Sequence, residues 1–177
     1  MNINYTPKKY IIADPHFYDN NIKLYENRKI SDEQMIIFWN EIVNPQDIIY
    51  ILGDFANGDL YTIKTLLAKL NGYKILIKGN HDNLTYKEYI DAGFNEVYFY
   101  PIIIDNFWIL SHEPLYININ MPYANIFGHV HNNPIYKDVS NRSFCACVER
   151  IDFKPILLNK AKEMILNANK ENNNEQY

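Results

Sequence analysis

Short apolar runs alternate along the first half of the chain with segments whose apolar residues recur at helical spacing. Three of the runs have the length of buried strands, at residues 8–13, 48–52 and 73–78. Between them, Ser31 opens a helical segment with Gln34 three positions later, the pattern of a capping box, and residues 60–70 form a second apolar stripe. This alternation predicts an α/β domain whose first half is β-α-β-α-β.

The second half predicts one more short helix, at residues 85–92, and more closely spaced strands. The apolar runs 96–104 and 107–111 flank Asp105-Asn106, a pair typical of a hairpin turn. Further strands are expected at residues 125–131, 143–151 and 153–158, before a last helix at residues 159–168. We therefore expect one domain over residues 1–168, richer in hairpins toward its end, and a polar, disordered tail at residues 169–177.

Composition and charge exclude some classes of function. The 177 residues are 47% hydrophobic and 21% charged, which is typical of a globular domain, and the formal net charge is −4. This charge predicts neither stable binding to duplex nucleic acid nor binding to an anionic membrane. The longest apolar stretch, residues 98–110, contains Asp105 and is too short to span a bilayer. The N-terminal sequence lacks the pattern of an export signal, so we expect a cytoplasmic protein.

The two cysteines, Cys145 and Cys147, occupy alternate positions of an expected strand. Alternate side chains of a strand point the same way, but this spacing is poor for a disulfide between them. A zinc site at a lone C-x-C pair would need further ligands. We interpret both cysteines as small buried side chains.

Every histidine of the chain lies just past an apolar run of strand length. The five are His16, His81, His112, His129 and His131. The ends of strands are where α/β proteins place their binding sites. Five of five at such positions indicates a shared function rather than five separate structural roles.

Two carboxylates and one amide follow strands in the same way. Asp14 precedes His16 by two residues, so in an extended segment both side chains point to the same side and can bind one ion. Asp54 follows Gly53, which lets the backbone turn, and Asn80 offers a neutral carbonyl oxygen.

The candidate metal ligands exceed what one tetrahedral zinc ion can use. They are Asp14, His16, Asp54, Asn80, His112, His129 and His131. If Asp54 bridges, the set suits two divalent ions about 3.5 to 4 Å apart, with about two positive charges in excess for an anionic phosphate ester. The imidazoles disfavour Mg²⁺ and Ca²⁺ and favour Mn²⁺, Fe or Zn²⁺, with Mn²⁺ the first choice in vitro.

These motifs, in this order, resemble the calcineurin-like metallophosphoesterase superfamily. Its pattern D-x-H, G-D, G-N-H-[D/E], H and G-H-x-H appears as Asp14-Pro15-His16, Gly53-Asp54, Gly79-Asn80-His81-Asp82, Ser111-His112 and Gly128-His129-Val130-His131. Residues 16–22, 53–58 and 111–114, with Arg28, are similar to the small bacterial and phage-type phosphoesterases of that superfamily. The fold that the resemblance implies is a four-layer α/β/β/α sandwich.

The resemblance also implies a role for each motif residue. Asp14, His16, Asp54 and His131 would hold one metal ion, and Asp54, Asn80, His112 and His129 the other. A metal-bridging hydroxide would attack phosphorus in line. His81, which is not a ligand, would stabilise the transition state or protonate the leaving oxygen, and Asp82 would orient and charge its imidazole.

The motifs do not assign a role to three further positions. Arg28 either reaches the substrate phosphate or is the charge of a solvated loop. Pro15 biases Asp14 toward an extended backbone. Asp19 stands where relatives in the small subgroup often have a second histidine.

The leading hypothesis is therefore a dinuclear metal-dependent phosphoric ester hydrolase, with a phosphodiesterase preferred to a phosphomonoesterase. The preference rests on a short chain with no obvious room for a capping domain, which suggests an open cleft. A small nucleotide-type diester is the expected substrate. A protein phosphatase and a non-catalytic scaffold of the same fold are the alternatives, and the intact His81 disfavours the scaffold. The sequence does not indicate the oligomeric state or the physiological substrate.

Overall fold

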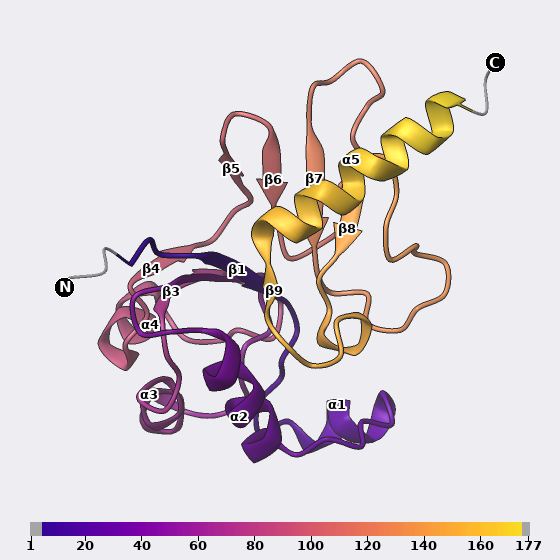
Figure 1. Cartoon of the computed structure of the whole chain (residues 1–177). Coiled ribbons are helices and arrows are strands. Elements are labelled where there is room, and N and C mark those ends of the chain that lie inside the picture. Colours follow the sequence, from indigo (N-terminus) through magenta and orange to yellow (C-terminus); the bar gives the residue numbers. More distant parts are fainter. Residues whose placement is uncertain (1–4, 175–177) are drawn as a thin grey trace.

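A computed structural model describes residues 5–174 and arranges them around two β-sheets (Figure 1). The first sheet consists of β1 Lys9–Ile12, β2 Ile48–Ile51, β3 Tyr73–Ile77, β4 Glu96–Tyr98 and β9 Ile156–Leu157. Its strand order is β4-β3-β2-β1-β9, with β1 to β4 parallel and β9 antiparallel to β1. The carboxyl ends of β1, β2 and β3 therefore meet at one edge of the sheet.

The second sheet consists of β5 Ile102–Ile104, β6 Trp108–Leu110, β7 Ala124–Phe127 and β8 Ser143–Cys145, in this order. Strands β5 and β6 form the hairpin predicted at Asp105-Asn106. Strands β6, β7 and β8 are parallel, so the expectation of a hairpin-rich second half is wrong beyond this one hairpin. Parallel pairing needs long crossovers, which the loops 111–123 and 128–142 supply.

The helices are α1 Asn20–Tyr25, α2 Asp32–Ile42, α3 Leu60–Leu67, α4 Tyr86–Ala92 and α5 Leu158–Asn174, with a 3₁₀ turn at Val148–Arg150. Ser31 caps α2, as predicted, by accepting a hydrogen bond from the backbone N–H of Gln34. Helix α1 was not predicted. None of its residues is buried, so its sequence has no apolar stripe to mark it; instead the Asp19 side chain caps its first turn.

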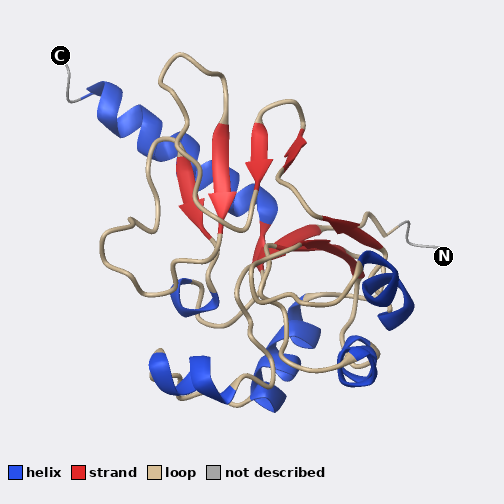
Figure 2. Ribbon diagram, turned by 180° about the vertical axis from the view of Figure 1, so that it is seen from behind, coloured by secondary structure: helices blue, strands red, loops and turns tan. Residues whose placement is uncertain are grey.

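Alternate residues of the parallel strands belong to two separate cores. Tyr10 and Ile12 join the apolar side chains of α2, α3 and α4, whereas Ile11 and Ala13 join those of the second sheet. Helix α5 contributes Ala161 to the second core and lies across the second sheet. Helices α2 to α4, the two sheets and α5 thus form the predicted α/β/β/α sandwich (Figures 1 and 2).

The apolar run 96–104 is divided between the two sheets, contrary to the prediction of one strand. Strand β4 pairs with β3, whereas β5 pairs with β6. Pro101 lies in the linker between them, where its missing N–H costs no ladder hydrogen bond. Phe99 and Tyr100, in the same linker, stay exposed.

Helix α5 continues to Asn174, so residues 169–174 are helical rather than part of the predicted tail. The Asn169 side chain donates to the Asn141 carbonyl oxygen at 2.6 Å. A helix that begins on packed residues can extend through polar sequence, because each further residue adds one backbone hydrogen bond. Residues 175–177 of the predicted tail lie outside the described residues. Neither α5 nor another helix within residues 5–174 is long and apolar enough to cross a membrane.

Candidate metal centre

The predicted ligands meet where strands of both sheets end. Asp14, Asp54 and Asn80 follow β1, β2 and β3, and His112, His129 and His131 follow β6 and β7. Segments far apart in the sequence are in direct contact here: the His129 N–H donates to Asp14 Oδ2 at 2.7 Å. The prediction that these strand ends converge is confirmed.

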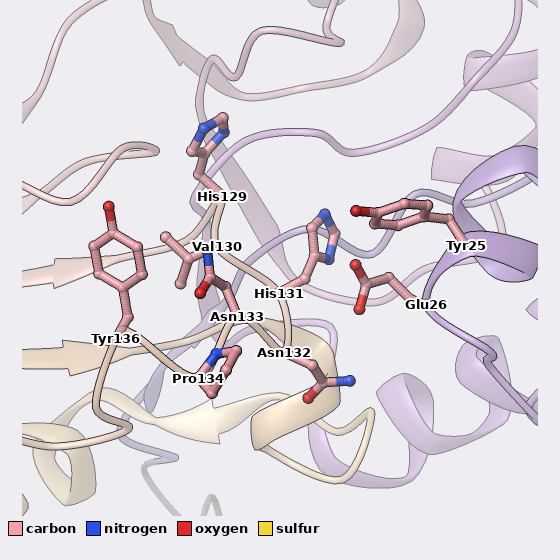
Figure 3. Close-up of a pocket in the computed structure, with 9 residues that line it drawn as sticks. All are labelled: Tyr25, Glu26, His129, Val130, His131, Asn132, Asn133, Pro134 and Tyr136. Atoms are coloured by element: carbon pink, nitrogen blue, oxygen red, sulfur yellow. The ribbon is translucent and has the colours of Figure 1, made fainter.

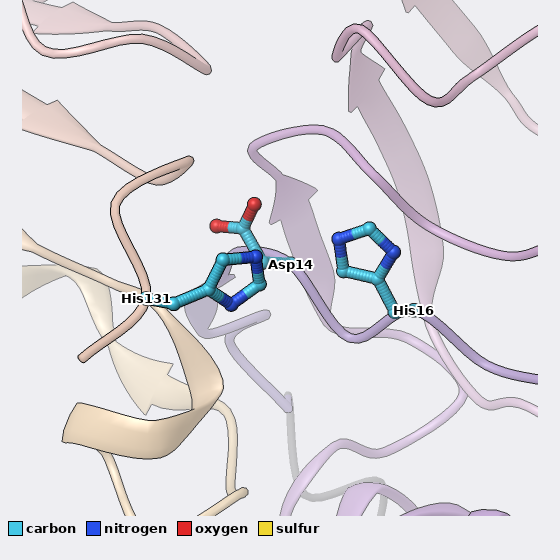
Figure 4. Close-up of side chains that lie close together, drawn as sticks. All are labelled: Asp14, His16 and His131. Atoms are coloured by element: carbon cyan, nitrogen blue, oxygen red, sulfur yellow. The ribbon is translucent and has the colours of Figure 1, made fainter. Parts of the chain in front are cut away.

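Three groups of side chains lie close enough together to bind a metal, and the ligands predicted from the sequence make up two of them; the third is Glu26, His131 and Glu149. In the inner group, Asp14, His16 and His131, and in the outer group, Asp54, His112 and His129, the ligand atoms lie within 4.8 Å of one another. Figure 4 shows the inner group, with the His131 imidazole next to the Asp14 carboxylate and the His16 imidazole to the right of both. We count Asn80 with the outer group, because its Oδ1 lies 2.8 Å from His112 Nε2 and 3.0 Å from His129 Nδ1.

Asp54 faces both groups with a single oxygen. Its Oδ1 accepts a hydrogen bond from the His81 backbone N–H at 2.8 Å. Its Oδ2 lies 3.4 Å from His16 Nε2 and 3.5 Å from His112 Nε2. This oxygen stands between a nitrogen of the inner group and one of the outer group, the position that a bridging ligand needs.

Asp14 also uses one oxygen for hydrogen bonds and leaves the other for the site. Its Oδ2 accepts from the His129 N–H and from the Cys147 thiol, whereas its buried Oδ1 has no hydrogen-bond partner within residues 5–174. Complete burial raises the pKa of this carboxyl well above its usual range. A cation next to Oδ1 would favour the ionised form again.

His112 presents a lone pair to the outer group. Its Nδ1 lies 2.9 Å from the Leu52 carbonyl oxygen, which can only accept, so the proton of the neutral ring is on Nδ1. Burial lowers the pKa of His112, which favours this neutral form. Its Nε2 lone pair therefore faces Asn80 Oδ1 and Asp54 Oδ2, two further electron-pair donors. Lone pairs that face one another in this way repel unless a cation lies among them.

The residues present fit two divalent cations. In the inner group, His16 Nε2 and Asp14 Oδ1 are buried without a hydrogen-bond partner among the described residues, which is rare in proteins. In the outer group, the lone pairs of His112 and Asn80 point at each other. A cation in each group would complete the coordination of these atoms, and imidazole with carboxylate suits Mn²⁺, Fe or Zn²⁺.

A buried ion pair between Arg28 and Glu149 supports His131 of the inner group. His131 Nδ1 lies 3.1 Å from Glu149 Oε1, and Arg28 Nε donates to the same oxygen at 2.8 Å. Although burial opposes charge on both residues, their pairing raises the pKa of His131 and lowers the pKa of Glu149. Glu149 was missed in the sequence, because it belongs to no motif and lies in the run 143–151 that was expected to be one strand, whereas the structure ends β8 at Cys145 and places Glu149 in the following 3₁₀ turn.

Arg28 does not reach toward a substrate, as one reading of the sequence proposed. Its side chain is fully buried. Besides binding Glu149, it donates to the carbonyl oxygens of Pro15 at 2.7 Å and Asp14 at 2.8 Å. All of these contacts tie together the chain segments that carry the inner group, so Arg28 positions the ligands.

Asp82 does not pair with the His81 imidazole, contrary to the prediction. Its buried carboxylate accepts hydrogen bonds from the backbone N–H groups of Asp54 at 2.8 Å, Phe55 at 2.9 Å and Gly79 at 2.9 Å. Burial raises the pKa of Asp82 to about 6. Asp82 thus joins the loops after β2 and β3, and it is placed to support ligands rather than to charge His81.

His81 lies at the edge of the site, as expected from its place in the G-N-H-D motif. Its side chain is exposed, and its ring centroid lies 5.3 Å from that of His16. It is therefore close to the inner group without being one of its members. Its role as a general acid stays a prediction.

Five ligand residues have a left-handed backbone, which non-glycine residues seldom adopt. The φ angles are +55° for Asp14, +45° for His16, +51° for Asp54, +72° for His129 and +44° for His131. The extended conformation predicted for Asp14 is therefore wrong. Hydrogen bonds from the backbone N–H groups of Asp14 and His16 to the carbonyls of Gly53 and Asp54 hold the turn. Such concentration of strain is typical of functional sites.

The motif glycines are required by close approach of other chain segments. A side chain at Gly53, whose φ is +83°, would collide with the His112 ring. A side chain at Gly79 would collide with the Asp54 carboxylate. Glycine is thus the residue that allows β2 and β3 to end against the ligands.

Both cysteines are buried free thiols, as interpreted from the sequence. Cys145 Sγ lies 3.3 Å from Cys147 Sγ, which lies 3.3 Å from Asp14 Oδ2. Burial raises the pKa of Cys147 far above its usual range. The neutral thiol of Cys147 therefore serves as a donor to the Asp14 carboxylate.

Two clefts border the centre. The large cleft, about 580 Å³, is lined by Tyr25, Glu26, residues 129–134 and Tyr136 (Figure 3). The small cleft, about 270 Å³, is lined by residues 77–80, 99–101, 111–113 and Leu115. The two clefts include different ligands in their walls: His129 and His131 in the first, Asn80 and His112 in the second.

The fold and the paired ligand groups define a class, that of α/β proteins with candidate metal ligands at the strand ends. The profile of the calcineurin-like phosphoesterase family, Metallophos, matches residues 8–155. The chain therefore belongs to the calcineurin-like phosphoesterase family, whose members are phosphoesterase hydrolases that generally use divalent metals.

Two relatives of this chain span nearly its full length. The uncharacterized protein MJ1445 of Methanocaldococcus jannaschii is 31% identical over 170 residues, which are 89% of this chain and 91% of that protein. The crystal structure of a protein of unknown function, AQ665 from Aquifex aeolicus, superimposes with a TM-score of 0.67 at 28% identity. It covers 90% of this chain and all of its own.

A nuclease has the same fold. The crystal structure of Pseudomonas putida nuclease MPE superimposes with a TM-score of 0.51 at 21% identity, over 70% of this chain and 61% of that chain. At this identity the likeness shows the fold alone.

Proposed function

We propose that this protein is a dinuclear metal-dependent phosphodiesterase that hydrolyses a small nucleotide-type diester. One observation carries the proposal: Asp54 Oδ2 lies between His16 Nε2 of the inner group and His112 Nε2 of the outer group, at 3.4 and 3.5 Å. A carboxylate oxygen in this position suits two adjacent cations, the arrangement of two-metal phosphoesterases.

The residues have separate tasks in this proposal. Asp14, His16 and His131 would hold one ion, Asn80, His112 and His129 would hold the other, and Asp54 would contribute to both. Two bound divalent ions supply an activated water and neutralise phosphate charge. We favour Mn²⁺, Fe or Zn²⁺, because five of the seven ligands are not carboxylates.

His81 is the residue that we propose to act on the substrate directly. It is exposed beside the inner group, and it is held there by its backbone N–H, which donates to Asp54 Oδ1. This leaves its imidazole available to donate a proton to the leaving oxygen or a hydrogen bond to the phosphoryl group. Asp82, which is engaged with backbone N–H groups, takes no direct part.

The two clefts support a diester rather than a monoester. A diester carries an organic group on each of two oxygens, and the site offers a cleft beside the inner group and another beside the outer group. A monoester would fill only one of them.

The proposal is tested by comparing bis-p-nitrophenyl phosphate with p-nitrophenyl phosphate in the presence of Mn²⁺. We expect a higher kcat/KM for the diester, and loss of both activities in Asp54→Asn. Asp91→Asn, an exposed aspartate of α4, is the matched control. A strong preference for the monoester would make the protein a phosphomonoesterase. No hydrolysis of any phosphate ester by metal-loaded protein would favour a non-catalytic scaffold.

A further inference from the structure

The small cleft combines the outer group with an exposed aromatic surface. Its walls include Phe99 and Tyr100 of the linker between β4 and β5, together with Leu115. Phe99 is 46% exposed and Tyr100 is 81% exposed. Aromatic rings exposed to this extent contribute little to the core, yet these lie in the wall that also contains Asn80 and His112.

Charged side chains of opposite sign flank this aromatic surface. Lys78 directly follows β3, and its ammonium group lies 4.9 Å from the centroid of the Phe99 ring, a cation–π contact. Glu113, which follows His112, lines the same cleft. Neither Lys78 nor Glu113 forms an ion pair with another residue of the described chain. The small cleft thus contains a charged donor, which lies over the Phe99 ring, and a charged acceptor in its wall.

The large cleft offers a different surface. The Tyr25 side chain directs its hydroxyl toward His131, and the Glu26 carboxylate lies nearby (Figure 3). The amides of Asn132 and Asn133 also line this cleft. These groups suit a hydrated, hydrogen-bonding substituent such as a sugar, whereas the small cleft suits a flat aromatic one.

We propose that the small cleft binds the nucleobase of the phosphoric ester, stacked on Phe99 in the cleft that Lys78 and Glu113 also line. This rests on the proposed function, because the phosphate must lie at the candidate metal centre for its base to enter this cleft. Stacking on an aromatic ring accepts every base. The cleft therefore selects esters with an aromatic substituent, and its charged residues adjust the preference among bases.

The test measures binding of two ligands that differ only in the base, thymidine 5′-monophosphate and 2-deoxyribose 5-phosphate, by calorimetry on Mn²⁺-loaded protein. We expect the nucleotide to bind more tightly by roughly 5- to 150-fold, the range that one base–aromatic stack supplies. Phe99→Ala should abolish this ratio, and Phe99→Trp should preserve it. Tyr61→Ala, which removes an exposed ring of α3, is the matched control and should leave the ratio unchanged. Manganese content and thermal unfolding show that each variant is folded and loaded.

Two results would overturn the proposal. Equal affinities for the two ligands in the unmodified protein would show that no base site exists. A ratio that survives Phe99→Ala but is lost in Tyr25→Ala would place the base in the large cleft. Either result leaves the proposed diesterase activity standing, whereas failure of the same preparation to hydrolyse bis-p-nitrophenyl phosphate would contradict that activity instead.

Discussion

The inner and outer groups contain similar ligand types but differ in their surroundings. In the inner group, Asp14 and His16 are buried, and His131 is held by the charged Glu149. In the outer group, His129 is exposed, and the buried His112 is held by the neutral carbonyl of Leu52. Asn80, also exposed, supplies an uncharged oxygen.

Because of this difference, we expect the two proposed ions to bind with different affinities. A carboxylate behind an imidazole raises its basicity and fixes its orientation more strongly than a carbonyl does. Burial also reduces competition from water for the ligands. We therefore expect the inner group to bind its ion tightly and the outer group to exchange its ion more readily.

The largest effect is expected from Asp54→Asn, because Asp54 faces both groups. We expect kcat/KM for bis-p-nitrophenyl phosphate to fall on the order of 10³-fold or more. Calorimetric titration with Mn²⁺ should show weaker binding at both sites. If the substitution weakened only one of the two Mn²⁺ sites, Asp54 would belong to that group alone and would not connect the two.

His81→Ala separates catalysis from metal binding. Because His81 is not a member of either group, both Mn²⁺ affinities should stay unchanged while kcat falls by about 10²- to 10⁴-fold, the usual contribution of a positioned acid. Steady-state kinetics and metal analysis of the same preparation check this. A near-normal kcat would remove His81 from the mechanism.

Glu149→Gln tests the support of the inner group alone. It removes the charge behind His131 and leaves Arg28 unpaired, so the inner affinity for Mn²⁺ should fall by about 10- to 100-fold. The outer affinity should not change. Glu163→Gln, at an exposed position of α5, serves as the control. Equal weakening of both sites would contradict the division into two differently held groups.

The smallest effect is expected from Cys147→Ala. Asp14 Oδ2 keeps its hydrogen bond from the His129 N–H, so the variant loses a weak thiol donor to this oxygen and the sulfur contact with Cys145. The free energy of unfolding should decrease by about 1 kcal/mol, and the inner affinity by a few-fold at most. Urea denaturation measures the first and calorimetry the second. A large loss of metal would mean that Cys147 is itself a ligand.

The members of both groups could be predicted from the sequence because local signals mark them. Each follows an apolar strand, and glycines precede Asp54, Asn80 and His129, where a side chain would collide with another ligand-bearing segment. The order of these short motifs was enough to indicate the fold. Strand ends and their adjacent glycines are local features, and a single chain displays them directly.

The residues that support the ligands could not be predicted from such local signals. Arg28 and Glu149 are 121 positions apart, and no local pattern relates them. Asp82 was assigned to its neighbour His81, but its acceptors are satisfied by the backbone of another loop. The run 96–104 was read as one strand because apolar periodicity does not show which sheet a strand joins. Contacts of this kind depend on how the two sheets are placed against each other.

The most direct test of the two-group site is the anomalous scattering of crystals grown with Mn²⁺. We expect two peaks about 3.5 to 4 Å apart, one bound by the inner group and one by the outer group, with Asp54 Oδ2 coordinating both. A single peak, or two peaks that Asp54 does not connect, would contradict the central claim.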